Sequence, residues 1–318
     1  MKDFALIGAA GYIAPRHMRA IRDTGNRLVA ALDGNDTVGV LDSFFPEAHF
    51  FTEFERFDRF LDLRRREGAA IDYVSVASPN YLHDSHIRFA LRSGANAVCE
   101  KPLVVNPWNI DALRQVEEEN GKKVSTILQL RLHPSIVALR EQVAAKRAAG
   151  HGRFSVDLSY ITSRGRWYHQ SWKGEDKKSG GITANIGIHF FDMLLWLFGP
   201  VQGQSVNHRA EDSASGTLQL RDADVRWFLS INVEHLPAAI AASGQRTYRS
   251  ITLDGEEIEF SDGFTDLHTD SYRHVLETGG FGLAEAEPSI SLVHAIRQAA
   301  VVGRSGEYHP LAAAAIPA

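Results

Sequence analysis

The first 130 residues alternate short apolar runs with longer stretches in which apolar residues recur at helical spacing. The short runs predict buried strands, because each is bounded by turn-forming or polar residues and is too short for a helix. They are Phe4–Ile7, Leu28–Leu32, Ile71–Ala77, Asn96–Cys99 and Val124–Leu130. Helices are expected over Pro15–Ile21, Arg56–Glu67, Tyr81–Ser93 and Pro107–Asn120. Strands that alternate with helices in this way are typical of a doubly wound parallel sheet.

Beyond Pro134 strands dominate the pattern. One helix is expected over Ser135–Ala149 and a last one over Ile290–Val302, and Asp254-Gly255 is a strong hairpin signal. Strands are expected at Phe154–Ile161, Gly216–Leu220, Val225–Val233, Tyr248–Leu253 and Glu256–Phe260. The sequence therefore predicts an α/β protein with two domains. Residues 1–130 form an N-terminal Rossmann-type domain with a doubly wound parallel sheet, and residues 131–318 form an α+β domain with a largely antiparallel, open-faced sheet.

The composition narrows the possible partners. The chain of 318 residues is 44% apolar and 23% charged, with a net charge of −5, which argues against a nucleic-acid partner. Apolar runs fall short of the roughly 20 residues of a membrane helix, so no membrane partner is expected. The single cysteine, Cys99, cannot form an internal disulfide, and this favours a reducing cytoplasm. The open sheet face suggests a homo-oligomer.

A small-residue turn after the first strand predicts a dinucleotide site. Gly11, Tyr12 and Ile13 lie between the strand and the start of a helix, where glycine allows close approach of a pyrophosphate and the helix offers free N–H groups. The next strand ends at Asp33, 22 residues after Gly11. A carboxylate there binds the adenosine ribose and repels a 2′-phosphate, so we expect NAD rather than NADP.

Two further strand ends are expected to line the cofactor crevice. Glu100-Lys101-Pro102 closes the strand Asn96–Cys99, and an ammonium at that edge of a parallel sheet can stabilise a developing alkoxide. The other strand end is Ser78-Pro79-Asn80, followed by His83 at the start of a helix. We expect these side chains near the nicotinamide.

The segment around residues 179–192 carries a second candidate for chemistry. Asn185 and His189 are four residues apart and would share one face of a helix. Together with the glycine-rich turn, Asp33 and Glu-Lys-Pro, this segment resembles the Gfo/Idh/MocA oxidoreductase family over essentially the whole chain. The resemblance implies that Lys101 and His189 flank the nicotinamide and the reacting carbinol. Many members of the family have aspartate where this chain has Asn185.

Within the family, Asn-Ile-Gly-Ile-His-Phe-Phe-Asp and Gly-Tyr-Ile-Ala-Pro-Arg-His look like the WlbA/WbpB group. This resemblance implies NAD-dependent oxidation of the C3 hydroxyl of UDP-N-acetylglucosaminuronic acid to the 3-keto sugar, for O-antigen and lipopolysaccharide. It also implies recycling of the bound NADH by α-ketoglutarate, and a cytoplasmic tetramer. In that group asparagine before the histidine is ordinary.

A UDP-linked amino uronate needs cations for its carboxylate and diphosphate. The candidates follow the last strand of the first domain or lie ahead of the Gly180-Gly181 turn: Arg131, Arg164, Arg166, Tyr168 and Lys173, with Trp167 and Trp172 for stacking. An exposed basic loop explains any single one of them almost as well. The histidines show no metal-ligand spacing with carboxylates, so no metal is expected.

Alternatives remain at this stage. Either Lys101 or His189 can be the base that takes the hydroxyl proton. The enzyme can instead be an inositol or aldose dehydrogenase of the same family, or a reductase running the other way. A regulator that senses NAD without catalysis is a third possibility, but it has no need of Lys101 and His189 together.

Overall fold

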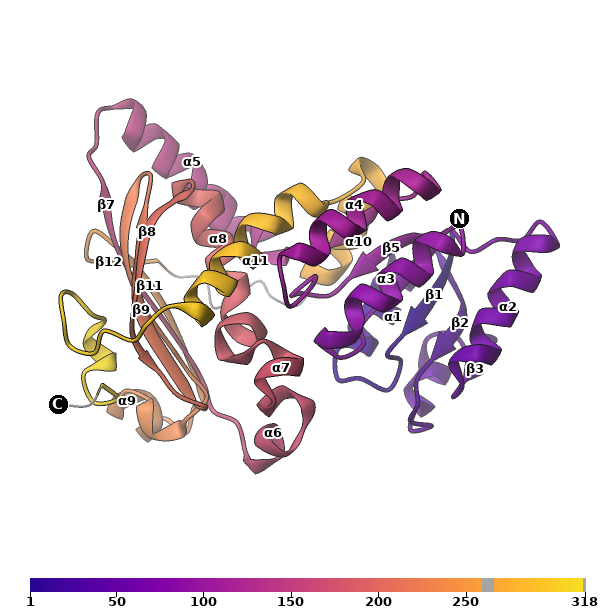
Figure 1. Ribbon diagram of the computed structural model, residues 1–318, viewed down its shortest axis with the longest axis horizontal. Helices are drawn as coiled ribbons and strands as arrows, with labels where there is room; N and C mark the ends of the chain where they lie inside the picture. Colours follow the sequence, from indigo (N-terminus) through magenta and orange to yellow (C-terminus); the bar gives the residue numbers. More distant parts are fainter. Residues whose placement is uncertain (259–265, 317–318) are drawn as a thin grey trace. The chain divides into compact units, whose positions relative to one another are not determined.

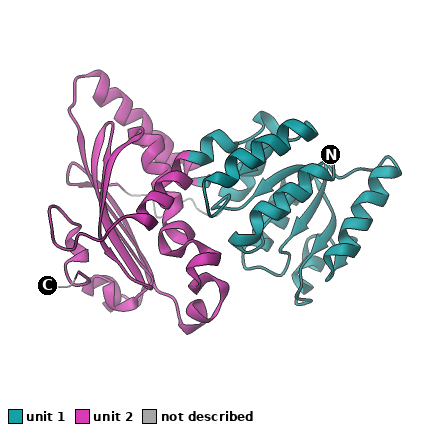
Figure 2. Ribbon diagram, in the orientation of Figure 1, with its two compact units in different colours: residues 1–129, 265–287 teal, residues 130–264, 288–318 magenta. Residues whose placement is uncertain are grey.

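The computed structural model describes residues 1–258 and 266–316. The chain forms two compact units, coloured separately in Figure 2: Met1–Gln129 with Thr265–Glu287, and Leu130–Phe264 with Pro288–Ala318. The first break lies next to the expected one. The later segment, Thr265–Glu287, groups with unit 1, whereas the sequence interpretation places it in the second domain.

Unit 1 is built on a six-stranded parallel sheet with the order β3-β2-β1-β4-β5-β6 (Figure 1). The strands are β1 (Asp3–Ile7), β2 (Arg27–Leu32), β3 (His49–Phe51), β4 (Tyr73–Val76), β5 (Asn96–Cys99) and β6 (Val124–Thr126). The helices are α1 (Ala14–Asp23), α2 (Phe54–Arg66), α3 (His83–Arg92) and α4 (Trp108–Asn120). The doubly wound fold is confirmed. The strand order reverses between β1 and β4, and open sheets of this kind bind ligands at the carboxyl ends of the strands there.

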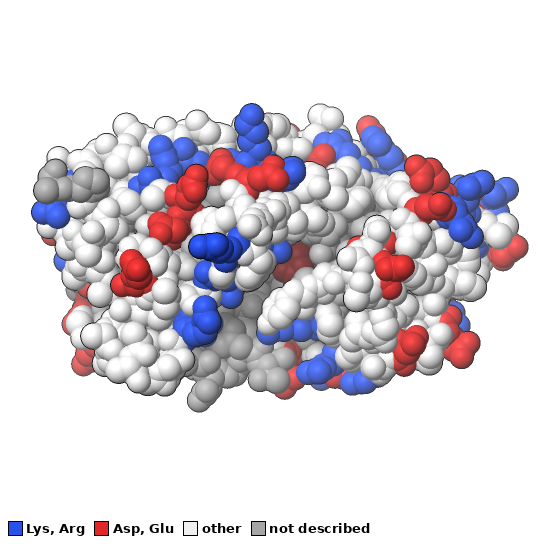
Figure 3. Space-filling model, turned by 90° about the horizontal axis from the view of Figure 1, so that it is seen from below, with Lys and Arg blue, Asp and Glu red and all other residues white. Residues whose placement is uncertain are grey.

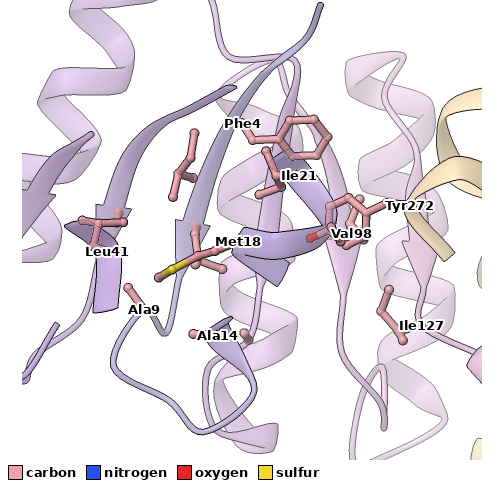
Figure 4. Close-up of a cluster of buried hydrophobic side chains, with 14 of the residues drawn as sticks. Phe4, Ala9, Ala14, Met18, Ile21, Leu41, Val98, Ile127 and Tyr272 are labelled. Carbon is pink, nitrogen blue, oxygen red and sulfur yellow. The ribbon is translucent and has the colours of Figure 1, made fainter. Parts of the chain in front are cut away.

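The core of unit 1 lies between β1 and the helices beside it. Phe4, Met18 and Ile21 are fully buried there, and Tyr272 packs among them (Figure 4). Tyr272 comes from α10 (Leu267–Thr278), which packs against α1. This helix was not expected from the sequence, because the side chains that it buries include the polar His268, Thr269 and Ser271.

Unit 2 is built on a six-stranded mixed sheet with the order β12-β11-β7-β10-β9-β8. The strands are β7 (Phe154–Thr162), β8 (Val201–Arg209), β9 (Ser213–Leu220), β10 (Ala223–Ser230), β11 (Thr247–Leu253) and β12 (Glu256–Glu257). Neighbouring strands pair antiparallel except β7 and β10, which pair parallel. The largely antiparallel sheet is thereby confirmed. Residues 259 and 260 of the last expected strand lie outside the described residues.

The helices of unit 2 include a long buried segment. They are α5 (Pro134–Ala148), α6 (Arg166–Gln170), α7 (Asp176–Ser179), α8 (Ile188–Phe198), α9 (Ala238–Ala242) and α11 (Leu283–Gln298), which begins in unit 1. By length and composition Asp176–Phe198 is apolar enough to cross a membrane, contrary to the expectation from the sequence. However, 72% of its apolar window is buried inside the fold, as in the core helix of a globular domain.

Candidate active site

The turn after β1 brings the backbone close to the end of β4. Gly8 has a φ of +93°, and a Cβ on it would lie 2.6 Å from the carbonyl carbon and oxygen of Ala77. Only glycine fits there without displacing the backbone. Gly8 was missing from the residues expected for the cofactor, although its place directly after a strand is the usual signal.

The start of α1 is open to an anion. Its N-cap, Ile13, makes no side-chain cap, and its first turn has no acidic residue. The side chain of Tyr12 is 91% exposed beside it. The N–H groups of Ala14 and Arg16 already bond to the carbonyl oxygens of Gly11 and Ile13, so it is the helix dipole and the lack of negative charge that favour phosphate here. These features fit a dinucleotide.

Asp33 is held against the same turn. Its Oδ2 accepts the Ala10 N–H at 2.9 Å, and its Oδ1 accepts the Asn35 N–H at 2.9 Å. Two backbone donors therefore orient the carboxylate just after the end of β2. A ligand bound at the turn meets a fixed negative charge.

The residues after β4 are largely buried. Ser78 and Asn80 are 8% and 5% exposed, and Pro79 joins them. Ser78 Oγ is hydrogen-bonded to His86 Nδ1 at 2.8 Å. Burial, with a smaller contribution from His83, lowers the pKa of His86 to about 4, so this imidazole is neutral at pH 7.

His83, which the sequence places near the cofactor, contacts the backbone after two strand ends. Its ring is fully buried, with Nδ1 2.8 Å from the Pro102 carbonyl oxygen and Nε2 2.8 Å from the Ser78 carbonyl oxygen. Both ring nitrogens face backbone carbonyl oxygens, and the neutral ring, which has one N–H, donates to one of them. Burial lowers the pKa of this histidine.

Lys101 follows β5 and is partly exposed, and the peptide bond to Pro102 is cis. Cys99 before it is fully buried, and burial raises the pKa of its thiol well above the ordinary value. A neutral buried thiol is a poor nucleophile. Of these residues, Lys101 is the one with a side chain suited to chemistry at the carboxyl edge of the sheet.

Glu100, expected among the cofactor-binding residues, contacts two histidines of unit 1. Its Oε1 lies 3.1 Å from His17 Nε2 and 2.8 Å from His268 Nε2. One ligand atom from each of these three buried residues lies within 4.8 Å of the others, close enough to be considered as a metal site. This cluster could not be predicted from residue spacing, because its members come from α1, the end of β5 and α10.

In unit 2, Asn185 and His189 are partly exposed on the same side of a largely buried helical segment. Among residues 181–194, all of them described, the partly exposed positions are Gly181, Asn185 and His189, and the others are buried. The shared face expected from the sequence is therefore present. Residues Thr183–Gly187 form a π-helical turn that leads into α8, and such turns are frequent at functional sites.

Cationic and aromatic side chains gather on α6 and the turn after it. Asn185 Nδ2 donates to the Tyr168 hydroxyl at 2.7 Å. Lys173 Nζ lies 4.2 Å from the centre of the Trp172 ring. Burial and the nearby Arg164 guanidinium lower the pKa of Lys173. These side chains form one group, whereas Arg166 is exposed at the start of α6.

This group suits an anion, because it concentrates positive charge beside aromatic faces. On the face shown in Figure 3, lysine and arginine side chains lie among aspartate and glutamate side chains and do not form one basic surface. A small anionic ligand fits such an arrangement better than an extended polyanion.

Arg131, expected to bind substrate, forms a buried ion pair with Asp192. Its Nε and Nη2 donate to the two carboxylate oxygens of Asp192 at 2.9 and 2.7 Å, and the two side chains are 9% and 3% exposed. A guanidinium held in this way orders the start of unit 2 against α8. It is a poor candidate for reading a substrate carboxylate.

Both halves of the chain match models of one protein family. Residues 2–128 match the NAD-binding Rossmann fold of the Gfo/Idh/MocA oxidoreductase family. Residues 153–276 match the C-terminal alpha/beta domain of that family. The matched segments lie one in each half of the chain.

Among solved structures, the chain is similar to the WlbA (WbpB) dehydrogenase from Thermus thermophilus. The structure of that enzyme with NAD and α-ketoglutarate has 51% identity and a TM-score of 0.93, covering 98% of this chain and 99% of that one. Its structure with NAD and UDP-GlcNAcA has 50% identity and the same TM-score, with coverage of 98% and 99%.

The curated relatives are more distant. Glucose-6-phosphate 3-dehydrogenase from Bacillus subtilis is 26% identical over 207 residues, which cover 62% of this chain and 54% of that enzyme. The chain spans about half the length of the first curated relatives that it matches.

Proposed function

Because the chain belongs to the Gfo/Idh/MocA oxidoreductase family, we propose that it is a dehydrogenase that oxidises the C3 hydroxyl of UDP-N-acetylglucosaminuronic acid, with NAD as hydride acceptor. The observation that supports this most is the 50% identity, over 98% of the chain, to a dehydrogenase solved with NAD and UDP-GlcNAcA. The substrate and the position of oxidation are proposals for this chain.

The cofactor site fits NAD. A Cβ at Gly8 would fill the space that the backbone of the turn needs, and the start of α1 has no acidic residue to oppose a pyrophosphate at the positive end of the helix dipole. Asp33 is fixed by Ala10 and Asn35 where it can accept the ribose hydroxyls and repel a 2′-phosphate. When bound, NAD supplies the acceptor for the hydride.

The chain's own residues handle the proton and the developing charge. Oxidation moves the hydroxyl proton to a base and the C3 hydride to the nicotinamide, leaving a carbonyl at C3. The Lys101 ammonium, at the carboxyl edge of the parallel sheet, is suited to stabilise the alkoxide. The His189 imidazole is suited to take the proton. The roles can also be exchanged, with Lys101 as base in its neutral form.

Recognition of the sugar nucleotide falls to unit 2. We assign the anionic groups of the substrate to Arg164, Arg166 and Lys173, and its rings to Trp167 and Trp172. The first two cations are exposed, and Lys173 lies over both indoles, at 4.2 and 5.9 Å. Tyr168, held by Asn185, supplies a hydroxyl beside them. Arg131 is left out of this set because Asp192 occupies its guanidinium.

The test is the discrimination between UDP-N-acetylglucosaminuronate and UDP-N-acetylglucosamine, which differ in one carboxylate. NADH formation is followed by fluorescence, with α-ketoglutarate present to recycle bound cofactor. One charged hydrogen bond is worth about 1.5–3 kcal/mol, so kcat/KM is expected to favour the uronate by roughly ten- to a hundredfold. Lys173→Met should reduce this preference, and Lys177→Met, on the exposed side of α7, is the matched control. Equal kcat/KM for the two sugars in the wild type overturns the uronate assignment.

A second candidate rests on an inositol 2-dehydrogenase from Rhizobium meliloti, which is 27% identical and matches over 86% of both chains. Faster turnover of inositols or free sugars than of UDP-sugars would favour that activity. Binding of NAD without turnover of any sugar would favour a regulator that senses the cofactor.

We further propose that the enzyme works as a cytoplasmic homotetramer in the synthesis of lipopolysaccharide O-antigen sugars. C-terminal residues such as Ile316 pack over Ile161 and Phe228 on one face of the unit 2 sheet, and both side chains are fully buried, so the surface proposed for self-association lies away from them. Light scattering of the purified protein tests the tetramer.

A further inference from the structure

Behind Lys101 lies a buried polar cluster that joins four elements of unit 1. It consists of His17 on α1, Ser75 on β4, Glu100 after β5, and His268 and Tyr272 on α10. All five side chains are buried. No step of the proposed oxidation uses them, yet a carboxylate and two imidazoles are costly to bury. Such a cluster requires an explanation.

We propose that Glu100 is a positioning residue, held by His17 and His268, which fixes the backbone of Lys101 so that the ammonium meets the reacting oxygen. This proposal rests on the proposed function, because it gives Glu100 a part in the same reaction. Glu100 itself does not touch the substrate.

The hydrogen bonds to Glu100 have a defined direction. An ionised carboxylate only accepts, so His17 Nε2 and His268 Nε2 both donate to Oε1, at 3.1 and 2.8 Å. Oε2 accepts the backbone N–H of Lys101 at 3.3 Å. Burial opposes ionisation of Glu100, but the two histidines outweigh it and hold its pKa well below the usual value. The carboxylate therefore connects both imidazoles to the lysine backbone.

The hydrogen bonds continue from His17 to Tyr272 and Ser75. Burial lowers the pKa of His17, so its ring is neutral, and with the proton on Nε2 its Nδ1 must accept. The Tyr272 hydroxyl lies 2.7 Å from this Nδ1 and donates to it. Ser75 Oγ lies 2.6 Å from the same hydroxyl oxygen and donates in turn. One assignment of protons gives every hydrogen bond in this chain a donor and an acceptor.

The distances around Glu100 distinguish hydrogen bonds from metal ligation. Two ligands about 2.1 Å from a tetrahedral metal ion stand roughly 3.3 Å apart. The separations of 2.8 and 3.1 Å from Glu100 Oε1 are shorter and match ordinary hydrogen bonds. Tyr272 also engages the second nitrogen of His17. The geometry points to a hydrogen-bonded network.

The network ties the strand that presents Lys101 to the helix that follows the nucleotide turn. His17 lies on α1, so the carboxylate of Glu100 links the cofactor turn to the catalytic strand end. Displacing a reacting group by about 1 Å can cost a hundredfold in rate. A loosened Glu100 should therefore lower kcat more than it weakens cofactor binding.

The test compares two substitutions of His268. His268→Gln keeps an N–H donor, whereas His268→Leu removes it and leaves the carboxylate of Glu100 short of one donor. We expect kcat of the leucine variant to fall roughly 10- to 100-fold. KM and the dissociation constant of NADH should change by less than about threefold, which is about 0.65 kcal/mol. The glutamine variant should keep most of the wild-type kcat. Ser271→Ala, which alters another buried side chain of α10, is the control for general damage to this helix.

A second readout needs no substrate. With selective ¹⁵N-lysine labelling, the amide signal of Lys101 is assigned by its loss in Lys101→Arg. His268→Leu and Glu100→Gln should shift this signal and speed its hydrogen exchange, and Ser271→Ala should not. If His268→Leu does not fold, Tyr272→Phe is used instead, because it removes the donor to His17 Nδ1 and keeps the ring.

The outcomes are distinct. An unshifted Lys101 amide together with wild-type kcat in the leucine variant overturns the positioning role. A loss of kcat in His268→Leu that is equally large in His268→Gln also overturns it. The purified wild type containing one equivalent of divalent metal, absent from His17→Ala, overturns it as well. A shifted amide in a protein that turns over no sugar nucleotide supports the positioning role and defeats the proposed function.

Discussion

At the scale of single residues, Lys101 is the group on which the proposed chemistry depends most. Lys101→Met keeps the length of the side chain and removes the charge. Loss of a positioned electrostatic group typically costs about 10²–10³ in rate, so kcat should fall by that factor. Binding of NAD, measured by fluorescence, should stay close to wild type because the nucleotide turn lies on another strand end.

Lys122→Met, at a partly exposed position in the connection between α4 and β6, provides the control for loss of one lysine. A kcat near wild type in Lys101→Met would exclude the ammonium from the reaction and leave His189 to carry it.

Asp33 is expected to make the enzyme prefer NAD over NADP. In Asp33→Ser the negative charge that opposes a 2′-phosphate is gone, while a hydroxyl remains for the ribose. The ratio of kcat/KM for NAD to that for NADP should fall by at least tenfold, or about 1.4 kcal/mol. Because Asp33 also accepts the Ala10 N–H, the turn loses a contact, and the melting temperature has to be measured alongside. An unchanged ratio would direct the search to Asp36 after the same strand.

Residue type and strand position were enough to select Lys101 and Asp33, because the carboxyl ends of parallel strands define one edge of the sheet. They were not enough for Glu100, His83 and Arg131. Each has a polar side chain near that edge, but each turns inward to a partner, and the direction of a side chain depends on packing. The partner of Glu100 on α10 is 168 residues further along the chain.

At the scale of elements, the turn between β1 and α1 is the most constrained one. Gly8→Ala puts a methyl group 2.6 Å from the Ala77 carbonyl in addition to the strain of a φ of +93°. Gly25 has a similar φ of +72°, but a Cβ added there would have no heavy atom within 4 Å. Gly25→Ala therefore isolates the cost of the backbone conformation, about 1–2 kcal/mol. We expect Gly8→Ala to lower the free energy of unfolding clearly more than Gly25→Ala and to weaken NAD binding.

Denaturant titrations of the two variants, with and without NAD, measure both effects. Equal destabilisation by the two substitutions would mean that the turn can move away from β4, and the close approach would then have no bearing on the cofactor.

Elements with strong apolar patterns were predictable, and weakly patterned ones were not. β3 has only three residues, and most residues of β8 are partly or fully exposed, so neither has the buried apolar run that predicts a strand. The last helix was expected from Ile290, whereas α11 begins at Leu283 and continues through Pro288. Proline usually marks a helix end, so the pattern favoured a later start. The π-helical turn at Thr183–Gly187 has no sequence signal of its own.

At the scale of the whole molecule, buried histidines make stability depend on pH. Burial lowers the pKa of His17 and His83, and it lowers the pKa of His86 and His309 to about 4. In the unfolded chain these imidazoles titrate near 6.5, so the unfolded state binds more protons between about pH 6.5 and 4. Their contribution to stability is complete above pH 6.5 and is lost as the pH falls through this window. The melting temperature should therefore drop steadily from pH 7 to pH 5.

His309→Gln tests one share of this effect. His309 accepts the Leu311 N–H and contacts Ser159 in unit 2, away from the proposed catalytic groups. The unfolding free energy of wild type falls between pH 7 and pH 4.5, and in the variant this fall should be smaller by on the order of 1–3 kcal/mol. A pH dependence identical to wild type would show that this imidazole is not buried in the folded protein.

The return of α10 to unit 1 has a consequence for synthesis on the ribosome. Domains generally fold as they emerge, at roughly 5–20 residues per second. Residues up to Gln129 emerge without His268 and Tyr272, which complete the core around Phe4 and the bonds to Glu100. About 140 residues of unit 2 must be translated first, which takes about 7–28 seconds at those rates. During that interval the Glu100 carboxylate has one histidine donor instead of two, and the nucleotide domain stays incomplete until α10 has been translated.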